Sequence, residues 1–184
     1  KTEKGCVVRF VQKEKEKEQQ AECVLIAVGR KANTEGLFAG EMSVEMERGR
    51  IVTDEQFQTS VKSIYAIGDV TSKIQLAHVA SAQGKMVAEI LAGAKNEMDL
   101  SVVPSCVYTS PEIACVGMTE AEARKEERKV RCGRYLTASN GKTLISGGSR
   151  GFVKLVFDEE NGEILGAQLM CERATDMIGE LATA

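Results

Sequence analysis

The first hundred residues contain one continuous apolar run and several shorter strand candidates. Cys23–Val28 is apolar throughout and ends at Gly29. Such a run is typical of a strand buried on both faces, as in a parallel sheet. Residues 13–18 alternate Lys and Glu, which predicts a solvated turn or the exposed end of a hairpin. Further short strands are predicted at Val7–Val11, Arg50–Thr53 and Ser63–Ile67.

A helical period replaces the strand pattern at Leu76 and continues to Leu91. Apolar residues recur there at spacings of three and four, and Gln83 is the only polar residue on the stripe. Gly93 follows just past the last apolar position, where helices commonly end. We therefore predict an amphipathic helix over residues 76–91.

The pattern changes near residue 100, where we place a domain boundary. Beyond it, Thr119 and Glu122 have the spacing of a capping box, which predicts the start of a helix. The pair Asn161 and Gly162 is a strong hairpin signal, and a last helix is predicted to begin near Thr175. The predicted strands of this part are Val102–Tyr108, Ile113–Val116, Val130–Leu136, Phe152–Phe157 and Ile164–Met170.

The composition is that of an ordinary soluble globular protein and excludes several classes of function. Hydrophobic residues make up 43% and charged residues 28% of the 184 positions. No apolar run reaches the roughly 18 residues of a membrane span. A net charge of −3, with 4% aromatic residues and no Trp, gives neither a basic footprint nor a stacking platform for nucleic acid. The start has no apolar stretch, so we expect no secretory signal. It also lacks Met, so we expect that the natural start has been removed or that the chain is a fragment.

The six cysteines and the single His do not predict a metal site. No two cysteines have the two-residue spacing of a zinc knuckle or a thioredoxin-type motif. We interpret them as reduced thiols of a cytoplasmic protein. Cys106 and Cys115, nine residues apart on separate predicted strands, are interpreted as core thiols and not as a redox pair.

Five segments in one order resemble the pyridine nucleotide-disulfide oxidoreductases. Each segment alone is a weak signal, whereas five in register over nearly the whole chain are specific for that family. Lys31 and Ala32 stand where the family usually has Arg and Pro. The five segments are Ala27–Thr34, Thr59–Asp69, Leu76–His78, Pro104–Glu120 and Gly162–Ala167.

The resemblance implies a fold that is α/β followed by α+β. Residues 1–22 would be the end of an NAD-binding domain. Residues 23–100 would be the returning, C-terminal part of a FAD-binding Rossmann-like domain. Residues 101–184 would be a truncated α+β dimerisation domain with a mainly antiparallel sheet.

The resemblance also implies an activity for the intact protein. The motif at residues 76–78 favours the branch of the family that oxidises dihydrolipoyl groups with NAD through FAD and a redox disulfide. Such an enzyme would be a homodimer through residues 101–184. It would serve a lipoyl-bearing 2-oxo acid dehydrogenase complex or a glycine cleavage system. The nearest alternative is a sister enzyme such as glutathione or mercuric reductase.

Asp69 is the first candidate cofactor residue. A carboxylate at the carboxyl end of a strand lies where ligands bind in open α/β sheets. A Gly-Asp pair also occurs simply in turns and helix caps. The resemblance implies that Asp69 holds the ribityl chain of FAD. It likewise places Gly29 close to bound NAD, although Gly29 also fits an ordinary turn at a strand end.

The start of the predicted helix is the second candidate site. A helix start presents unpaired N–H groups and a partial positive charge, which suits the pyrimidine edge of a flavin. The resemblance places four residues there, acting mainly through their backbone. Without the motif, the His would be interpreted as a surface or capping residue. The four residues are Gln75, Leu76, Ala77 and His78.

No residue of this chain is assigned a catalytic role. The resemblance implies a redox disulfide with four intervening residues and a His-Glu pair, and we expect both to lie outside these 184 residues. We therefore expect the isolated chain to be inactive and not to hold FAD or NAD. A different class of function also fits the pattern, in which residues 101–184 act only as a cofactor-free dimerisation module.

Overall fold

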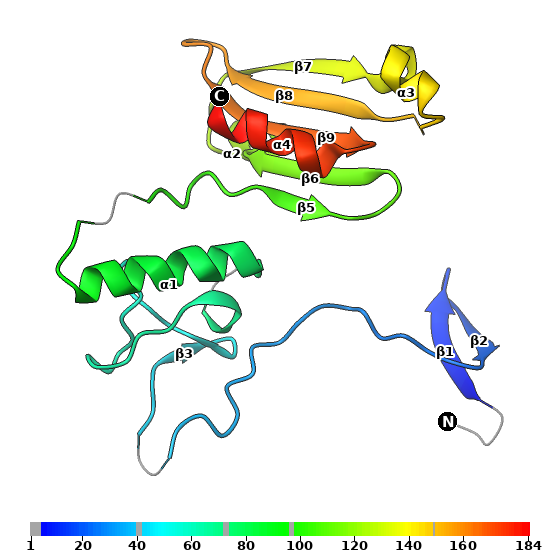
Figure 1. The fold of residues 1–184 in the computed structure, drawn as a ribbon. Helices are drawn as coiled ribbons and strands as arrows, with labels where there is room; N and C mark the ends of the chain where they lie inside the picture. Colours follow the sequence, from blue (N-terminus) through cyan, green and yellow to red (C-terminus); the bar gives the residue numbers. More distant parts are fainter. Residues whose placement is uncertain (1–4, 40–41, 72–73, 96–97, 149) are drawn as a thin grey trace.

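The computed structural model describes residues 5–39, 42–71, 74–95, 98–148 and 150–184. It begins with an antiparallel hairpin of β1 (Cys6–Gln12) and β2 (Lys15–Ala21) that projects from the rest of the chain (Figure 1). Its turn residues Lys13 and Glu14 have φ of 51° and 60°. The strand predicted at residues 7–11 and the exposed hairpin end are therefore confirmed.

The strand predicted at Cys23–Val28 is wrong. These residues form no strand, and the side chains of Leu25 and Ile26 are 89% and 80% exposed. A strand buried on both faces needs neighbouring strands and covering helices, and no described segment pairs with this one. The strand predicted at Ser63–Ile67 is also wrong. It too lacks a neighbouring strand in the described part of the chain, since a single isolated bridge between Tyr65 and Gln58 is its pairing.

The first half of the chain contains a small hydrophobic cluster centred on Val44, Ile51 and Ala66. Its hairpin consists of β3 (Met46–Glu47) and β4 (Arg50–Ile51), so the strand predicted from Arg50 is confirmed in its first two residues. The short 3-10 helix η1 (Gly68–Val70) follows, and then α1 (Ala77–Leu91), as the helical period predicts. Gly93 ends α1 with a φ of 71°, a left-handed conformation that glycine adopts freely.

The second half of the chain forms a five-stranded antiparallel sheet in the order β5-β6-β9-β8-β7. The predicted mainly antiparallel sheet is therefore confirmed, with the first strand shorter than predicted. The predicted hairpin between the last two strands is confirmed, and Gly162 has a φ of 77°. The strands are β5 (Ser105–Val107), β6 (Glu112–Gly117), β7 (Val130–Leu136), β8 (Phe152–Asp158) and β9 (Ile164–Cys171).

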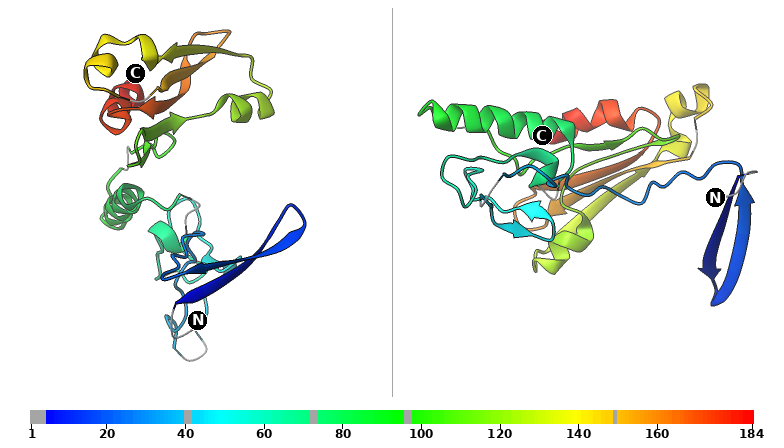
Figure 2. Two further views of the ribbon diagram at one scale, coloured as in Figure 1. Left: turned by 90° about the vertical axis from the view of Figure 1, so that its right-hand side faces the viewer. Right: turned by 90° about the horizontal axis from the view of Figure 1, so that it is seen from below.

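Helices cover both faces of this sheet. The helix α4 (Ala174–Thr183) lies along one face, and α2 (Glu120–Lys125) packs at one end of the other, as Figure 2 shows. The predicted capping box is present, because Thr119 accepts a hydrogen bond from the Glu122 N–H while the Glu122 side chain accepts from the Thr119 N–H. Two short helices, η2 (Thr137–Ser139) and α3 (Gly141–Ile145), connect β7 to β8. No helix in the described ranges is long and apolar enough to cross a membrane.

The main core lies between α4 and the sheet. Leu169 of β9, the central strand of the sheet, is 1% exposed and packs with Ile178 of α4. Cys106 and Cys115 are free, half-buried thiols, and Cys106 packs against the main core as predicted. Cys106 pairs with Ala114 and Cys115 with Ser105, so the two thiols lie on opposite faces of the sheet.

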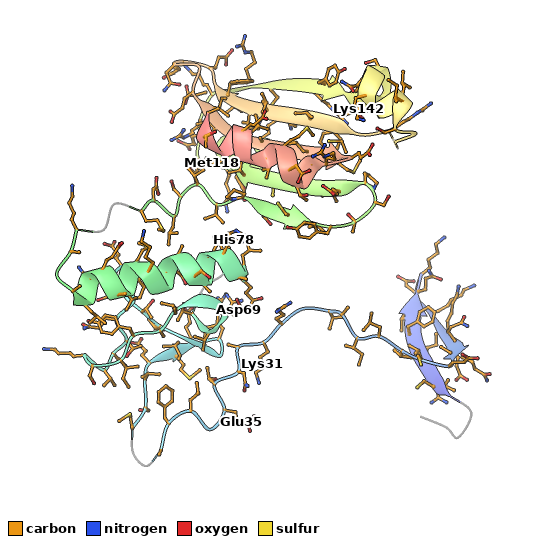
Figure 3. All side chains as sticks on the ribbon, viewed as in Figure 1. Lys31, Glu35, Asp69, His78, Met118 and Lys142 are labelled. Carbon is orange, nitrogen blue, oxygen red and sulfur yellow. The ribbon has the colours of Figure 1, made fainter. Side chains whose placement is uncertain are left out.

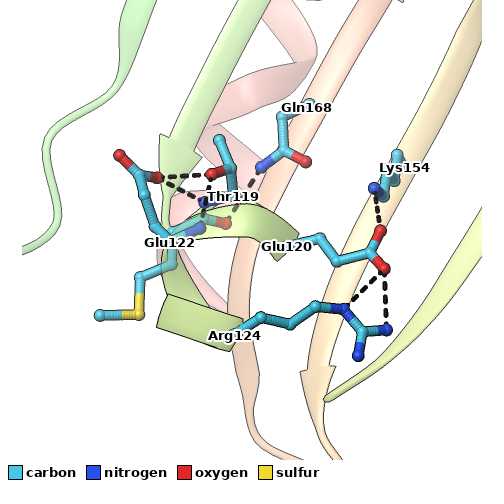
Figure 4. Close-up of polar contacts among 7 residues, drawn as sticks. Thr119, Glu120, Glu122, Arg124, Lys154 and Gln168 are labelled. Carbon is cyan, nitrogen blue, oxygen red and sulfur yellow. Dashed lines mark hydrogen bonds and ion pairs between the residues drawn. The ribbon is translucent and has the colours of Figure 1, made fainter. Parts of the chain in front are cut away.

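The opposite face carries an ion-pair cluster that ties α2 to the sheet (Figure 4). Lys154 Nζ of β8 lies 2.6 Å from Glu120 Oε2, and Arg124 donates two hydrogen bonds to Glu120 Oε1 at 3.1 and 2.9 Å. The hydrogen bonds from Lys154, Arg124 and the Cys132 thiol lower the pKa of Glu120 to about 2. The cluster is satisfied internally, which indicates a structural role.

This cluster predicts a specific loss of stability in acid. Because the pKa of Glu120 is lower in the folded chain than in the unfolded chain, its stabilising contribution is complete above the ordinary glutamate pKa. That contribution is lost as the pH falls from about 4.5 to about 2. Unfolding with urea at a series of pH values measures this loss. Glu120→Gln should be less stable at neutral pH and should show a flatter decline. An identical decline in both proteins would exclude Glu120 as a source of the acid sensitivity.

Candidate functional site

The turn before α1 is held in one conformation by the helix itself. Gly68 is buried and has a φ of 69°. A Cβ atom at this position would lie 3.0 Å from the Cβ of Ala80, so a larger residue would meet α1. The Gly68 N–H donates to Gln83 Oε1 at 2.7 Å, and the Gly68 carbonyl accepts from both the N–H and the hydroxyl of Thr71. Both polar groups of this backbone position are therefore engaged.

Asp69 follows directly in η1 and keeps an accessible carboxylate. Its side chain is 45% exposed, and Oδ2 lies 3.9 Å from Arg30 Nη1. An exposed ion pair at this distance is weak, so Asp69 can still accept hydrogen bonds from a ligand. The contact brings the segment of Gly29 and Arg30 to the same turn. Gly29 itself is exposed, with a φ of 127° and open space where a Cβ would be.

The start of α1 offers backbone donors that have no acceptor within the helix. Leu76 is the N-cap residue and provides no side-chain cap. The first N–H that bonds to the N-cap carbonyl is that of Ala80. The N–H groups of Ala77 and His78 therefore have no acceptor within the helix, and the helix dipole makes this end partially positive. Gln75 lies half-buried just before the cap.

His78 also uses its side chain, which the sequence does not predict. Its Nε2 lies 2.9 Å from the carbonyl oxygen of Pro104, so it links α1 to the segment that leads into the five-stranded sheet. This hydrogen bond is exposed, and exposed bonds contribute little because water competes for both partners. The backbone N–H of His78 remains directed along the helix start.

The structure thus brings most of the predicted site residues to one end of α1. Figure 3 shows Asp69 and His78 at that end, with Lys31 nearby on the preceding segment. Two contributors were not predicted, Arg30 beside Asp69 and Gln83 behind Gly68. For Gln83 a signal was available in the sequence, because it is the single polar residue on the apolar stripe of the helix.

The chemistry of this end is that of a binding site. A carboxylate accepts hydrogen bonds from hydroxyl groups, while free N–H groups donate to carbonyl or anionic oxygens. The set can therefore bind hydroxyl groups through Asp69 and carbonyl or anionic oxygens through the helix start. No group of three or more His, Cys, Asp or Glu residues that could hold a metal occurs in the described part of the chain.

Two family matches cover most of the chain. Residues 1–84 match the pyridine nucleotide-disulphide oxidoreductase domain, and residues 103–184 match the dimerisation domain of the same proteins. A dihydrolipoyl dehydrogenase of Bacillus subtilis is 42% identical over 181 residues, covering 98% of this chain and 38% of the relative. One of Staphylococcus aureus is 38% identical over all 184 residues, or 39% of its own length.

Solved structures agree with the fold. LpdA from Mycobacterium tuberculosis superposes with a TM-score of 0.85 at 27% identity, covering 99% of this chain and 39% of that one. The HOCl-induced flavoprotein disulfide reductase RclA from Escherichia coli gives a TM-score of 0.82 at 27% identity, covering 95% and 40%. The chain therefore spans about two fifths of the length of the relatives that it matches.

Proposed function

This chain belongs to the pyridine nucleotide-disulfide oxidoreductases, and from this membership we propose that it supplies part of the flavin bed and the subunit interface of a dihydrolipoyl dehydrogenase. The similarity to curated dihydrolipoyl dehydrogenases along nearly the whole chain supports this choice within the family. The enzyme would act on lipoyl groups of a 2-oxo acid dehydrogenase complex or a glycine cleavage system, in the cytoplasm.

The observation that carries the proposal is the pairing of an accessible carboxylate with an uncapped helix start. Asp69 would accept hydrogen bonds from the ribityl hydroxyls of FAD. The N–H groups of Ala77 and His78 would donate to the pyrimidine edge, flanked by Gln75 and Leu76. Their partial positive charge favours the extra negative charge that a flavin takes up on reduction. FAD, when bound, supplies the two-electron chemistry that the side chains of this site lack.

The remaining assignments follow from the same proposal. Gly29 would lie near bound NAD, and its lack of a side chain would let the dinucleotide approach the backbone. Residues 1–22 would end an NAD-binding domain, and residues 23–100 would close a FAD-binding domain. The five-stranded sheet unit of residues 101–184 would form the homodimer, and closed two-fold dimers are the commonest oligomers.

The test compares the full-length flavoprotein with the isolated 184-residue chain. The full-length protein should be yellow and should oxidise dihydrolipoamide with NAD. The isolated chain should show no such turnover, because no two of its cysteines have four intervening residues and its single His is used at the helix start. Binding alone does not replace a covalent relay.

The outcomes separate the alternatives. If the full-length protein reduces glutathione disulfide or mercuric ion and leaves dihydrolipoamide untouched, the assignment moves to a sister enzyme. A colourless dimer of the isolated chain would support the alternative in which residues 101–184 act only as a cofactor-free dimerisation module. Lipoamide-dependent turnover by the isolated chain would contradict the proposal that the redox centre lies elsewhere.

A further inference from the structure

Gln83 is a buried polar side chain on an otherwise apolar helix face. It is 6% exposed, and together with Val79, one turn earlier, it is one of the two buried residues of α1. Its Oε1 accepts the Gly68 N–H at 2.7 Å. Among the described residues, Gln83 is the one side chain of α1 that makes a hydrogen bond to the turn that carries Asp69.

The acceptor is needed because the turn is buried against the helix. A Cβ at Gly68 would lie 3.0 Å from Ala80, and a Cβ at Gly84 would lie 3.3 Å from Ile67 Cδ1. Gly68 and Gln83 are both buried, so water has little access to the Gly68 N–H. A buried donor without a partner is costly. Removing the acceptor should therefore release the turn from the helix.

The same bond fixes where Asp69 lies. The Gly68 N–H is held by Gln83 and the Gly68 carbonyl by Thr71, so the backbone entering Asp69 is fixed on both sides. Since Gln83 belongs to α1, the backbone that carries Asp69 is held in place relative to the donors at the start of that helix.

We propose that Gln83 is a positioning residue for flavin binding, which sets the Asp69 carboxylate at the correct place beside the N-terminus of α1. The inference rests on the proposed function, because it assumes that Asp69 contacts FAD. Gln83 itself would not touch the cofactor, and its effect would pass entirely through the Gly68–Asp69 turn.

The test measures FAD affinity of the full-length holoprotein by flavin fluorescence during dilution. Gln83→Met keeps the length of the side chain and removes the acceptor, and it should weaken FAD binding by about three- to tenfold. Gln83→Glu keeps an acceptor oxygen at the same reach and should stay within about twofold of the wild type. Far-UV circular dichroism and thermal melting of the variants verify that α1 is formed.

A double-mutant cycle with Asp69→Ala separates positioning from a general loss of stability. In the Asp69→Ala background, Gln83→Met should cost less than about twofold, since the carboxylate that it positions is gone. An equal loss in both backgrounds would overturn the inference, as would wild-type affinity in Gln83→Met or failure of Gln83→Glu to restore binding. If Asp69→Ala itself retains FAD normally, the proposed function of Asp69 fails, and the role of Gln83 falls with it.

Discussion

Leu169→Ala should destabilise the chain by about 2.7–5 kcal/mol, the range for truncating a fully buried leucine. Leu169 is 1% exposed in the central strand β9, and it pairs with Ala114 of β6 on one side and Val153 of β8 on the other. Ile178 of α4 packs in the same cluster. The small neighbour Ala114 cannot fill the vacated space, so the full cost of the cavity should be observed. Unfolding with urea, followed by far-UV circular dichroism, measures the change.

Leu144→Ala provides the matched control. Leu144 lies in α3 and is 66% exposed, so the same change of side chain should shift the free energy of unfolding by less than about 0.5 kcal/mol. If both variants lost the same free energy of unfolding, Leu169 would not lie at the centre of a core that the five-stranded sheet and α4 share.

The sheet unit was largely predictable from sequence because its elements carry their own signals. The strands alternate in polarity and bury one face against α4. The connections between them carry local signals, such as the capping residue Thr119 and the turn residue Gly162. The helix α3 (Gly141–Ile145) was not predicted. It is five residues long and its Asn140 cap lacks the reciprocal partner that marks α2, so the sequence has no strong start signal there.

The apolar run at Cys23–Val28 shows the opposite case. Its apolar composition indicates that the segment needs neighbouring strands and covering helices. The segment itself cannot supply these neighbours. In the described residues the run has no neighbouring strand, and Val28 is 94% exposed. The pattern of apolar residues predicts how deeply a segment should be buried. Whether the segment forms a strand also depends on partner strands from other parts of the sequence. The strand predicted at Ser63–Ile67 failed for the same reason.

Only part of the candidate site was predictable from the sequence. The predictable residues belong to local motifs, whereas the others make contacts between positions that are far apart along the chain. Asp69 and the start of α1 belong to local sequence motifs, so the sequence places both. The contact of Arg30 with Asp69 spans 39 positions, and the bond from Gly68 to Gln83 spans 15. No motif encodes such contacts. Only the polar interruption of an apolar stripe at Gln83 gave a signal in advance.

Asp69→Ala in the full-length protein should weaken FAD retention by about ten- to hundredfold. A hydrogen bond to a charged group contributes roughly 1.5–3 kcal/mol, and Asp69 offers the accessible carboxylate of the turn beside α1. The variant also leaves Arg30 without this ion-pair partner, but that pair is exposed and contributes little. Flavin release, followed by fluorescence during dilution, measures the loss.

His78→Ala is the informative comparison, because His78 lies nine positions further along and at the same end of α1. The substitution removes the exposed hydrogen bond from Nε2 to the Pro104 carbonyl. It keeps the backbone N–H that we propose as the flavin donor, and alanine is a good helix former. FAD retention should therefore change far less than in Asp69→Ala. If both variants lost flavin equally, the link to Pro104 would have to position the flavin bed, and a backbone donor at His78 would not explain binding.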